Sequence, residues 1–141
     1  MWEEPMDFIK SMFIAASGLK AQTGRMRVIA ENIANADSTG QTPGEDPYRR
    51  KVPTFTNSFD SKVEAELVKL GKVREDQSEF KLRYEPDHPA ANDKGYVKMP
   101  NVSTLVEMAD MQEATRSYEA NLNVVKSSRS MMQKTLDILR G

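Results

Sequence analysis

The single histidine of this chain lies in its most chemically suggestive stretch. Glu85, Asp87 and His88 follow one another with only prolines among them, and carboxylates beside an imidazole can bind a metal ion or transfer a proton. Adjacent residues of an extended loop point in different directions, however, and no second group of ligands is spaced to join these three. The chain also has no cysteine, which excludes thiolate sites. We therefore expect no catalytic residue, no metal site and no cofactor, and we interpret the cluster as part of a turn.

A basic triplet is the second motif that suggests chemistry. Arg49, Arg50 and Lys51 are consecutive, and such a cluster can bind the phosphates of nucleic acid. Only Tyr48 supplies an aromatic side chain beside the triplet, and the net charge of the chain is −1. We expect no nucleic-acid binding, and we predict instead that the triplet contacts an acidic surface of a neighbouring subunit.

The elements that would position these residues include a long helix at the end of the sequence. From Met108 to Leu139, residues at alternating steps of three and four form a seven-residue repeat without glycine or proline, which predicts a helix with one packing seam. Ser103 or Thr104 can cap this helix, and Thr104 with Glu107 has the spacing of a capping box. The positions of the seam are Met108, Met111, Thr115, Tyr118, Leu122, Val125, Arg129, Met132, Leu136 and Leu139.

A similar repeat begins the chain and predicts a second long helix. Its seam positions are Ile9, Met12, Ala16, Leu19, Thr23, Met26, Ala30 and Ile33. We expect the two helices to pair as a coiled coil. Polar seam residues such as Thr23 and Arg129 weaken a contact between only two helices, so we infer that other subunits supply further contacts.

The middle of the chain has a different character. Glycines and prolines forbid regular structure between about residues 38 and 47. Residues 51–59 alternate like a strand that Pro53 confines to a sheet edge. We prefer a strand to the competing helix for residues 62–70, and we predict short strands at residues 80–84 and 96–99.

The predicted fold is therefore mainly α with a small β-rich module. We expect an N-terminal extension at residues 1–6, an N-terminal helix at 7–35, a loop and β-rich outer module at 36–102, and a C-terminal helix at 103–141. The sequence opens with acidic residues where a secretory signal would be basic, and no apolar run approaches a membrane span. We expect a chain that is cytosolic or exported without a cleaved signal peptide, and that does not span a membrane.

Three stretches resemble flagellar basal-body rod proteins, and most closely the FlgC family of the proximal rod. Residues 17–22 together with 32–40 resemble the N-terminal signature shared by rod, hook and hook-associated proteins. Residues 84–102 resemble a stretch particular to FlgC, and residues 108–121 resemble the shared C-terminal motif. The loop at residues 41–47 departs from this pattern.

The resemblance implies a tubular assembly of terminal-helix coiled coils with the middle segment outside. It also implies export through the flagellum-specific type III apparatus into the periplasmic rod of the basal body. The implied partners are other copies of the chain and other rod proteins, with membrane-ring and export-apparatus components as further candidates.

We accordingly predict a non-enzymatic structural subunit of the flagellar proximal rod, which transmits torque through packed helices. The alternative is a coiled-coil adaptor protein that does not polymerise. The predicted assembly interface comprises Ile9, Met12, Leu19, Met26, Asn32, Ile33, Asn35, Arg49, Arg50, Met108, Met111, Tyr118, Asn121, Leu122, Val125, Met132, Leu136 and Leu139.

Overall fold

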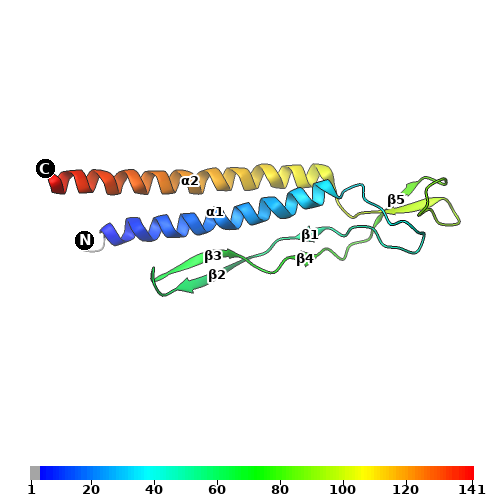
Figure 1. Cartoon of the computed structure of the whole chain (residues 1–141), viewed down its shortest axis with the longest axis horizontal. Helices are drawn as coiled ribbons and strands as arrows, with labels where there is room; N and C mark the ends of the chain where they lie inside the picture. The colour runs from blue at the N-terminus through cyan, green and yellow to red at the C-terminus, as the bar shows by residue number, and fades with distance from the viewer. Residues whose placement is uncertain (1–3) are drawn as a thin grey trace. The chain divides into compact units, whose positions relative to one another are not determined.

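The computed structural model describes residues 4–141 and consists of two long helices with short strands between them in sequence (Figure 1). This confirms the predicted class of two terminal helices and a small β segment, while the coiled-coil pairing stays a prediction. Of the expected N-terminal extension, residues 1–3 lie outside the described residues and residues 4–6 belong to the first helix. The elements are α1 (Glu4–Ala34), β1 (Lys51–Val52), β2 (Phe55–Asp60), β3 (Ala65–Leu70), β4 (Arg74–Glu75), β5 (Lys81–Tyr84), β6 (Tyr96–Met99) and α2 (Thr104–Arg140).

The strands form three antiparallel pairs, β1 with β4, β2 with β3, and β5 with β6. The strand predicted within residues 62–70 is confirmed, because β3 pairs along its whole length with β2, from Phe55 opposite Leu70 to Asp60 opposite Ala65. Pro53 lies between β1 and β2, where a residue without an amide hydrogen interrupts the ladder. The strands predicted at residues 80–84 and 96–99 are confirmed as β5 and β6.

One of two compact units contains the chain up to Met26, residues 54–72 and residues 113–141. In this unit the β2–β3 hairpin contacts α1, because the Val68 amide donates a hydrogen bond of 3.1 Å to Ser17 Oγ. The two helices run antiparallel here, since Gly18 lies against Asn121 while Arg25 lies 3.6 Å from Glu113.

The two helices bury mainly small side chains in this first unit. Ala15 and Ala21 of α1 and Ala114 and Ser128 of α2 are all buried. All four lie between the predicted seam positions, which are half-buried or exposed. The close approach of the helices therefore uses small residues beside the seam.

The second unit contains residues 27–53 and 73–112. Its apolar centre is formed by Ala90, Val97 and Met99 from the β5–β6 region, with Ala91 packed against them. Ile29, on the part of α1 that belongs to this unit, is also buried. Within the described residues, neither helix is long and apolar enough to cross a lipid bilayer.

Gly18 gives a direct test of the helix contact. A Cβ at this position would lie 2.7 Å from Asn121 Nδ2, so a larger side chain must displace Asn121. We expect Gly18→Leu to lower the free energy of unfolding by about 1–3 kcal/mol in urea denaturation, although leucine is the better helix former. Shortening the neighbour in Gly18→Leu/Asn121→Ala should recover stability. Gly44→Leu is the control, because nothing lies within 4 Å of a Cβ there. A more stable Gly18→Leu variant would contradict the close contact.

Candidate assembly interface

The most completely bonded side chain of the second unit is that of Asn32, near the end of α1. Its side-chain oxygen accepts hydrogen bonds from the Tyr48 hydroxyl at 2.7 Å and from the Lys51 amide at 2.9 Å. Its side-chain nitrogen donates to the Lys51 carbonyl at 2.8 Å and to Glu107 Oε2 at 3.2 Å. All four hydrogen-bonding positions of the amide are thus filled, and the residue is 0% exposed. Because Asn32 pairs with both backbone groups of Lys51, it holds β1 as a neighbouring strand would.

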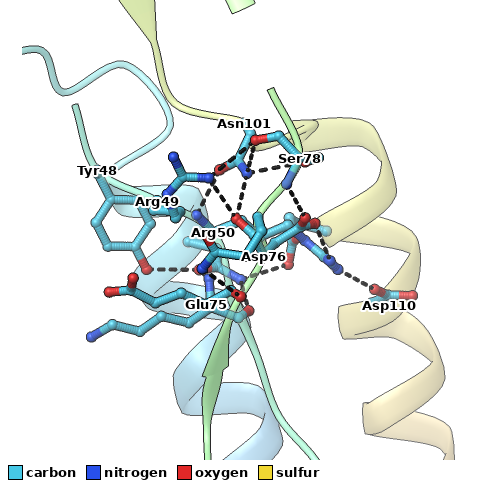
Figure 2. A network of polar contacts seen from close by, with 12 residues as sticks. Tyr48, Arg49, Arg50, Glu75, Asp76, Ser78, Asn101 and Asp110 are labelled. Atoms are coloured by element: carbon cyan, nitrogen blue, oxygen red, sulfur yellow. Dashed lines mark hydrogen bonds and ion pairs between the residues drawn. The ribbon is translucent and has the colours of Figure 1, made fainter. Parts of the chain in front are cut away.

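Arg50 supplies the positive charge beside this amide. Its guanidinium contacts Glu107 directly, lies 3.5 Å from Asp76 and lies 3.7 Å from Asp110 (Figure 2). Burial lowers the pKa of Arg50, but the hydrogen bonds and charges of Glu107 and Asp76 outweigh burial and raise it. The Glu107 side chain, 1% exposed, is paired with this guanidinium and accepts a hydrogen bond from Asn32, as a buried carboxylate requires.

Asn101 holds the other side of the same extended segment. Its side-chain oxygen accepts a 2.7 Å hydrogen bond from the Arg50 amide, and its nitrogen donates to the carbonyls of Asp76 and Ser78 (Figure 2). The Arg50 carbonyl accepts a hydrogen bond from the Asp76 amide at 2.8 Å. Arg50 and Lys51, at the start of β1, thus bond to different partners: Lys51 bonds to α1, and Arg50 bonds to Asn101 and to Asp76, which follows β4.

Asp76 is stabilised as an anion at this junction. The amide and hydroxyl of Ser78 donate to its carboxylate and, with the neighbouring Arg50, hold its pKa below the usual value. This contribution to stability is present above the ordinary pKa of an aspartate and is lost as the pH falls through the lowered value. Among the described residues that are not exposed, every buried side-chain nitrogen and oxygen has a partner, so the network is closed.

Large apolar side chains remain exposed on both helices. On α1 they include Ile9, Phe13 and Ile14. On α2 the last turns carry Ile138 and Leu139, each 78% exposed. Further exposed apolar residues of α2 are Leu105, Val106, Met108, Val124, Met131 and Leu136. Apolar residues that recur along a helix and stay in water are typical of an unfilled protein interface.

The structure distributes the predicted interface residues over three environments. Ile9, Met108, Leu136 and Leu139 are exposed, and Asn32 is fully buried. Thr115 and Met26, which are both seam residues, contact each other at 3.8 Å. The half-buried members of the prediction are Met12, Leu19, Met26, Ile33, Asn35, Arg49, Arg50, Met111, Tyr118, Asn121, Leu122, Val125 and Met132.

The basic triplet has partners within the chain, and its predicted contact with an acidic surface of a neighbouring subunit stays a prediction. Arg49 stacks 4.2 Å from the centre of the Phe80 ring and donates to the carbonyls of residues 76 and 78. Lys51 pairs with Glu31 at 2.7 Å, and Arg50 bonds Glu107. The charges could be neutralised internally because carboxylates distant in sequence lie beside the triplet.

The sequence interpretation missed Glu107 and Asn101 as organising residues. Glu107 has the spacing of a capping box with Thr104, but helix α2 begins at Thr104 and the Glu107 carboxylate bonds Asn32 and Arg50 instead. Asn101 had no distinguishing pattern. Three consecutive cations in a chain of balanced charge were the one available signal that buried carboxylates lay nearby.

His88 is engaged in local structure. Its Nδ1 accepts a hydrogen bond from the Ala90 amide at 2.9 Å, and its Nε2 lies 3.2 Å from Thr39 Oγ1. The His88 amide in turn donates to the Glu85 carbonyl, which closes a turn. Among the side chains that the structure describes, no group of three potential ligands is suitably placed for a metal ion.

Comparisons with known proteins find matches along most of the chain. A family model described as flagella basal body rod protein matches residues 12–40, and one described as flagellar basal body rod FlgEFG protein C-terminal matches residues 93–138. The flagellar basal-body rod protein FlgC of Agrobacterium fabrum is 52% identical over 128 residues, which cover 91% of this chain and 92% of that protein. FlgC of Bacillus subtilis is 40% identical over 148 residues, covering 94% and 99%, and FlgC of Escherichia coli O6:H1 is 46% identical over 125 residues, covering 89% and 92%.

Replacing the Asn32 amide by a carboxylate tests the network with almost no change in shape. In Asn32→Asp the donor to the Lys51 carbonyl and to Glu107 becomes an acceptor, which places an anion against a carbonyl and a second anion. We expect the free energy of unfolding in urea to fall by about 2–4 kcal/mol, because two buried hydrogen bonds are lost. Asn123→Asp, on the exposed surface of α2, is the matched control and should change stability by less than about 0.5 kcal/mol. Equal effects of the two substitutions would contradict the role of Asn32.

Tyr48 should titrate later than an ordinary tyrosine. Burial, together with the negative charges of Glu31, Glu107 and Glu75, raises its pKa from 10.0 to about 12. The folded chain therefore favours the neutral phenol, and this contribution to stability is full below pH 10 and is lost as the pH rises towards 12. In a pH titration, the phenolate absorbance of the four tyrosines should show a late component, which is a step at higher pH than that of an ordinary tyrosine. Tyr48→Phe should remove this step and Tyr84→Phe should retain it. A late component that survives in Tyr48→Phe would contradict this environment.

Proposed function

The chain belongs to the FlgC family of flagellar basal-body rod proteins, and from this premise we propose that it is a subunit of the proximal rod that assembles by helix packing into a torque-transmitting tube. It is a structural protein of the basal-body rod and not an enzyme. The finer proposal concerns how the subunits assemble and how they transmit torque.

The observation that carries the proposal is the exposure of apolar side chains along both helices. Leu136, Ile138 and Leu139 occupy the last turns of α2, and Phe13 is 50% exposed on α1. Burying such a side chain completely contributes about 1.5–3 kcal/mol, so helices of neighbouring subunits would gain by covering these positions. The seam residues of both helices are the surface that we propose for this contact.

The closed polar network suits a part that transmits torque. The side chains of Asn32, Arg50 and Asn101 join α1 to Lys51 of β1, to Glu107 of α2 and to Asp76, which follows β4. A satisfied network of this kind resists local opening, because breaking one member leaves buried polar groups without partners. We propose that it keeps the helix ends and the extended segment together under load.

We also propose the partners and the location of the chain. Its neighbours would be other copies and other rod proteins, with membrane-ring and export-apparatus components as further candidates. The chain would reach the periplasmic rod without a cleaved signal peptide, through the flagellum-specific export apparatus. The family membership supports each of these proposals.

Leu136 and Leu139 allow the assembly surface to be tested without disturbing the free chain. Both are exposed, so Leu136→Asp/Leu139→Asp should leave the circular dichroism and thermal stability of the purified chain unchanged. In cells we expect the variant to be made but to be lost from isolated basal bodies, with swimming motility abolished, because charges cannot be buried against a neighbouring helix. Ser61→Asp, at an exposed position between β2 and β3, should leave rods and motility intact. Normal rods with the double variant, or discrete soluble complexes in place of a helical lattice in electron micrographs, would contradict the proposal and favour the adaptor.

A further inference from the structure

The two compact units of the chain carry opposite net charge. Residues 27–53 and 73–112 contain nine basic and twelve acidic residues, a net charge of −3. The remaining residues contain eleven basic and nine acidic residues, a net charge of +2. A chain that is nearly neutral as a whole thus presents complementary charges on two different units, and such units of separate copies attract one another.

The positive charge is concentrated on the last part of α2. Lys126, Arg129, Lys134 and Arg140 are all exposed, and none of them forms an ion pair with a side chain of residues 8–141. Lys126, Arg129 and Arg140 are three, eleven and fourteen residues apart, which places them along one side of a helix. Lys134 lines the same surface hollow as Lys126 and Arg129, and we call these four residues the basic face. Only Asp137 is acidic among residues 126–140.

The negative unit contains a hollow that can receive a cationic side chain. It has a volume of about 520 Å³, and its lining includes Glu31, Tyr48, Glu75 and Phe80. We call it the acidic hollow. The Glu75 carboxylate forms no ion pair within the described part of the chain, and neither does that of the exposed Glu79 nearby in sequence.

The cationic side chains that line the acidic hollow already have partners within the chain. Lys51 pairs with Glu31, and Arg49 is held by the Phe80 ring and by two backbone carbonyls. The raised pKa of Tyr48, caused by burial and then by Glu31, Glu107 and Glu75, supports a negative local potential. Glu75 is therefore the group that an incoming ammonium or guanidinium would meet.

We propose that the basic face of α2 on one copy docks against the acidic hollow on a second copy, with Lys126, Arg129 and Lys134 directed towards Glu75 and Glu79. The two surfaces differ, so the contact is heterologous and leaves a free surface at each end of a pair, from which an open chain of copies can grow. This contact rests on the proposed function. It gives the assembly a direction, and its charges fix how neighbouring copies align. The apolar positions of the helices supply burial, and the charges select the partner surface.

Charge reversal on both surfaces tests the contact with the full-length purified chain. Lys126→Glu/Arg129→Glu/Lys134→Glu should weaken self-association at least about tenfold in analytical ultracentrifugation, and salt should weaken that of the wild type in the same direction. The matched control is Lys62→Glu/Lys69→Glu/Lys72→Glu, which changes the charge equally at exposed positions around the β2–β3 hairpin and should associate as the wild type does. Circular dichroism checks that each variant is folded.

The decisive variant combines the reversed basic face with Glu75→Lys/Glu79→Lys. Because both surfaces lie on every chain, reversing both should restore self-association to within about threefold of the wild type. The proposal is overturned if the wild type does not self-associate, if the reversed basic face leaves association unchanged, or if the combined variant is not restored. Binding of the basic face to phosphatidylglycerol vesicles without any effect on self-association would likewise overturn it and assign the face to lipid. None of these outcomes depends on rods formed in cells, so the loss of rods in Leu136→Asp/Leu139→Asp stands as a separate result.

Discussion

A single buried amide, that of Asn32, is the contact on which the second unit depends. It takes both backbone groups of Lys51, the Tyr48 hydroxyl and the Glu107 carboxylate, and so joins residues that are far apart in the sequence. Arg50 contacts the same Glu107 carboxylate and pairs with it. The extended segment around Lys51 is thereby joined to two helices by hydrogen bonds and an ion pair, whose geometry fixes direction and register more strictly than apolar packing does.

The helices are built for a different purpose in the first unit. Small side chains such as Ala15, Gly18 and Ala114 allow the helices to approach within the chain, while larger ones such as Phe13 and Leu139 remain in water. This arrangement buries small side chains and exposes large apolar ones, which is the reverse of what is expected for an isolated helical protein. Among structural proteins of a rod this distribution has a clear use, because the buried surface that each chain lacks is supplied by its neighbours.

The sequence was sufficient for the elements and the family but not for the contacts. Period-seven repeats predicted both helices, and alternation predicted β5, β6 and the strand within residues 62–70, because these signals are local. The same repeats identified the contact face within the chain only in part, because the seam residues Met26 and Thr115 contact each other while the buried Ala114 lies beside the seam. A heptad pattern counts large apolar residues, whereas this helix contact also uses small ones. Glu107 and Asn101 were missed because a carboxylate or amide is recognised as buried only when its distant partner is known.

Hydrogen exchange of the chain, free and within isolated rods, tests the central claim most directly. The claim is that polar bonds order the second unit without a partner subunit, whereas the last turns of α2 become protected only when neighbouring subunits cover them. In the free chain we predict strong protection of the amides of Arg50, Lys51 and Asp76, and rapid exchange across residues 124–140. In rods the same helical residues should become protected, while protection around Lys51 should change little. Equal protection of both regions in the free chain, or no gain at residues 124–140 on assembly, would contradict the account.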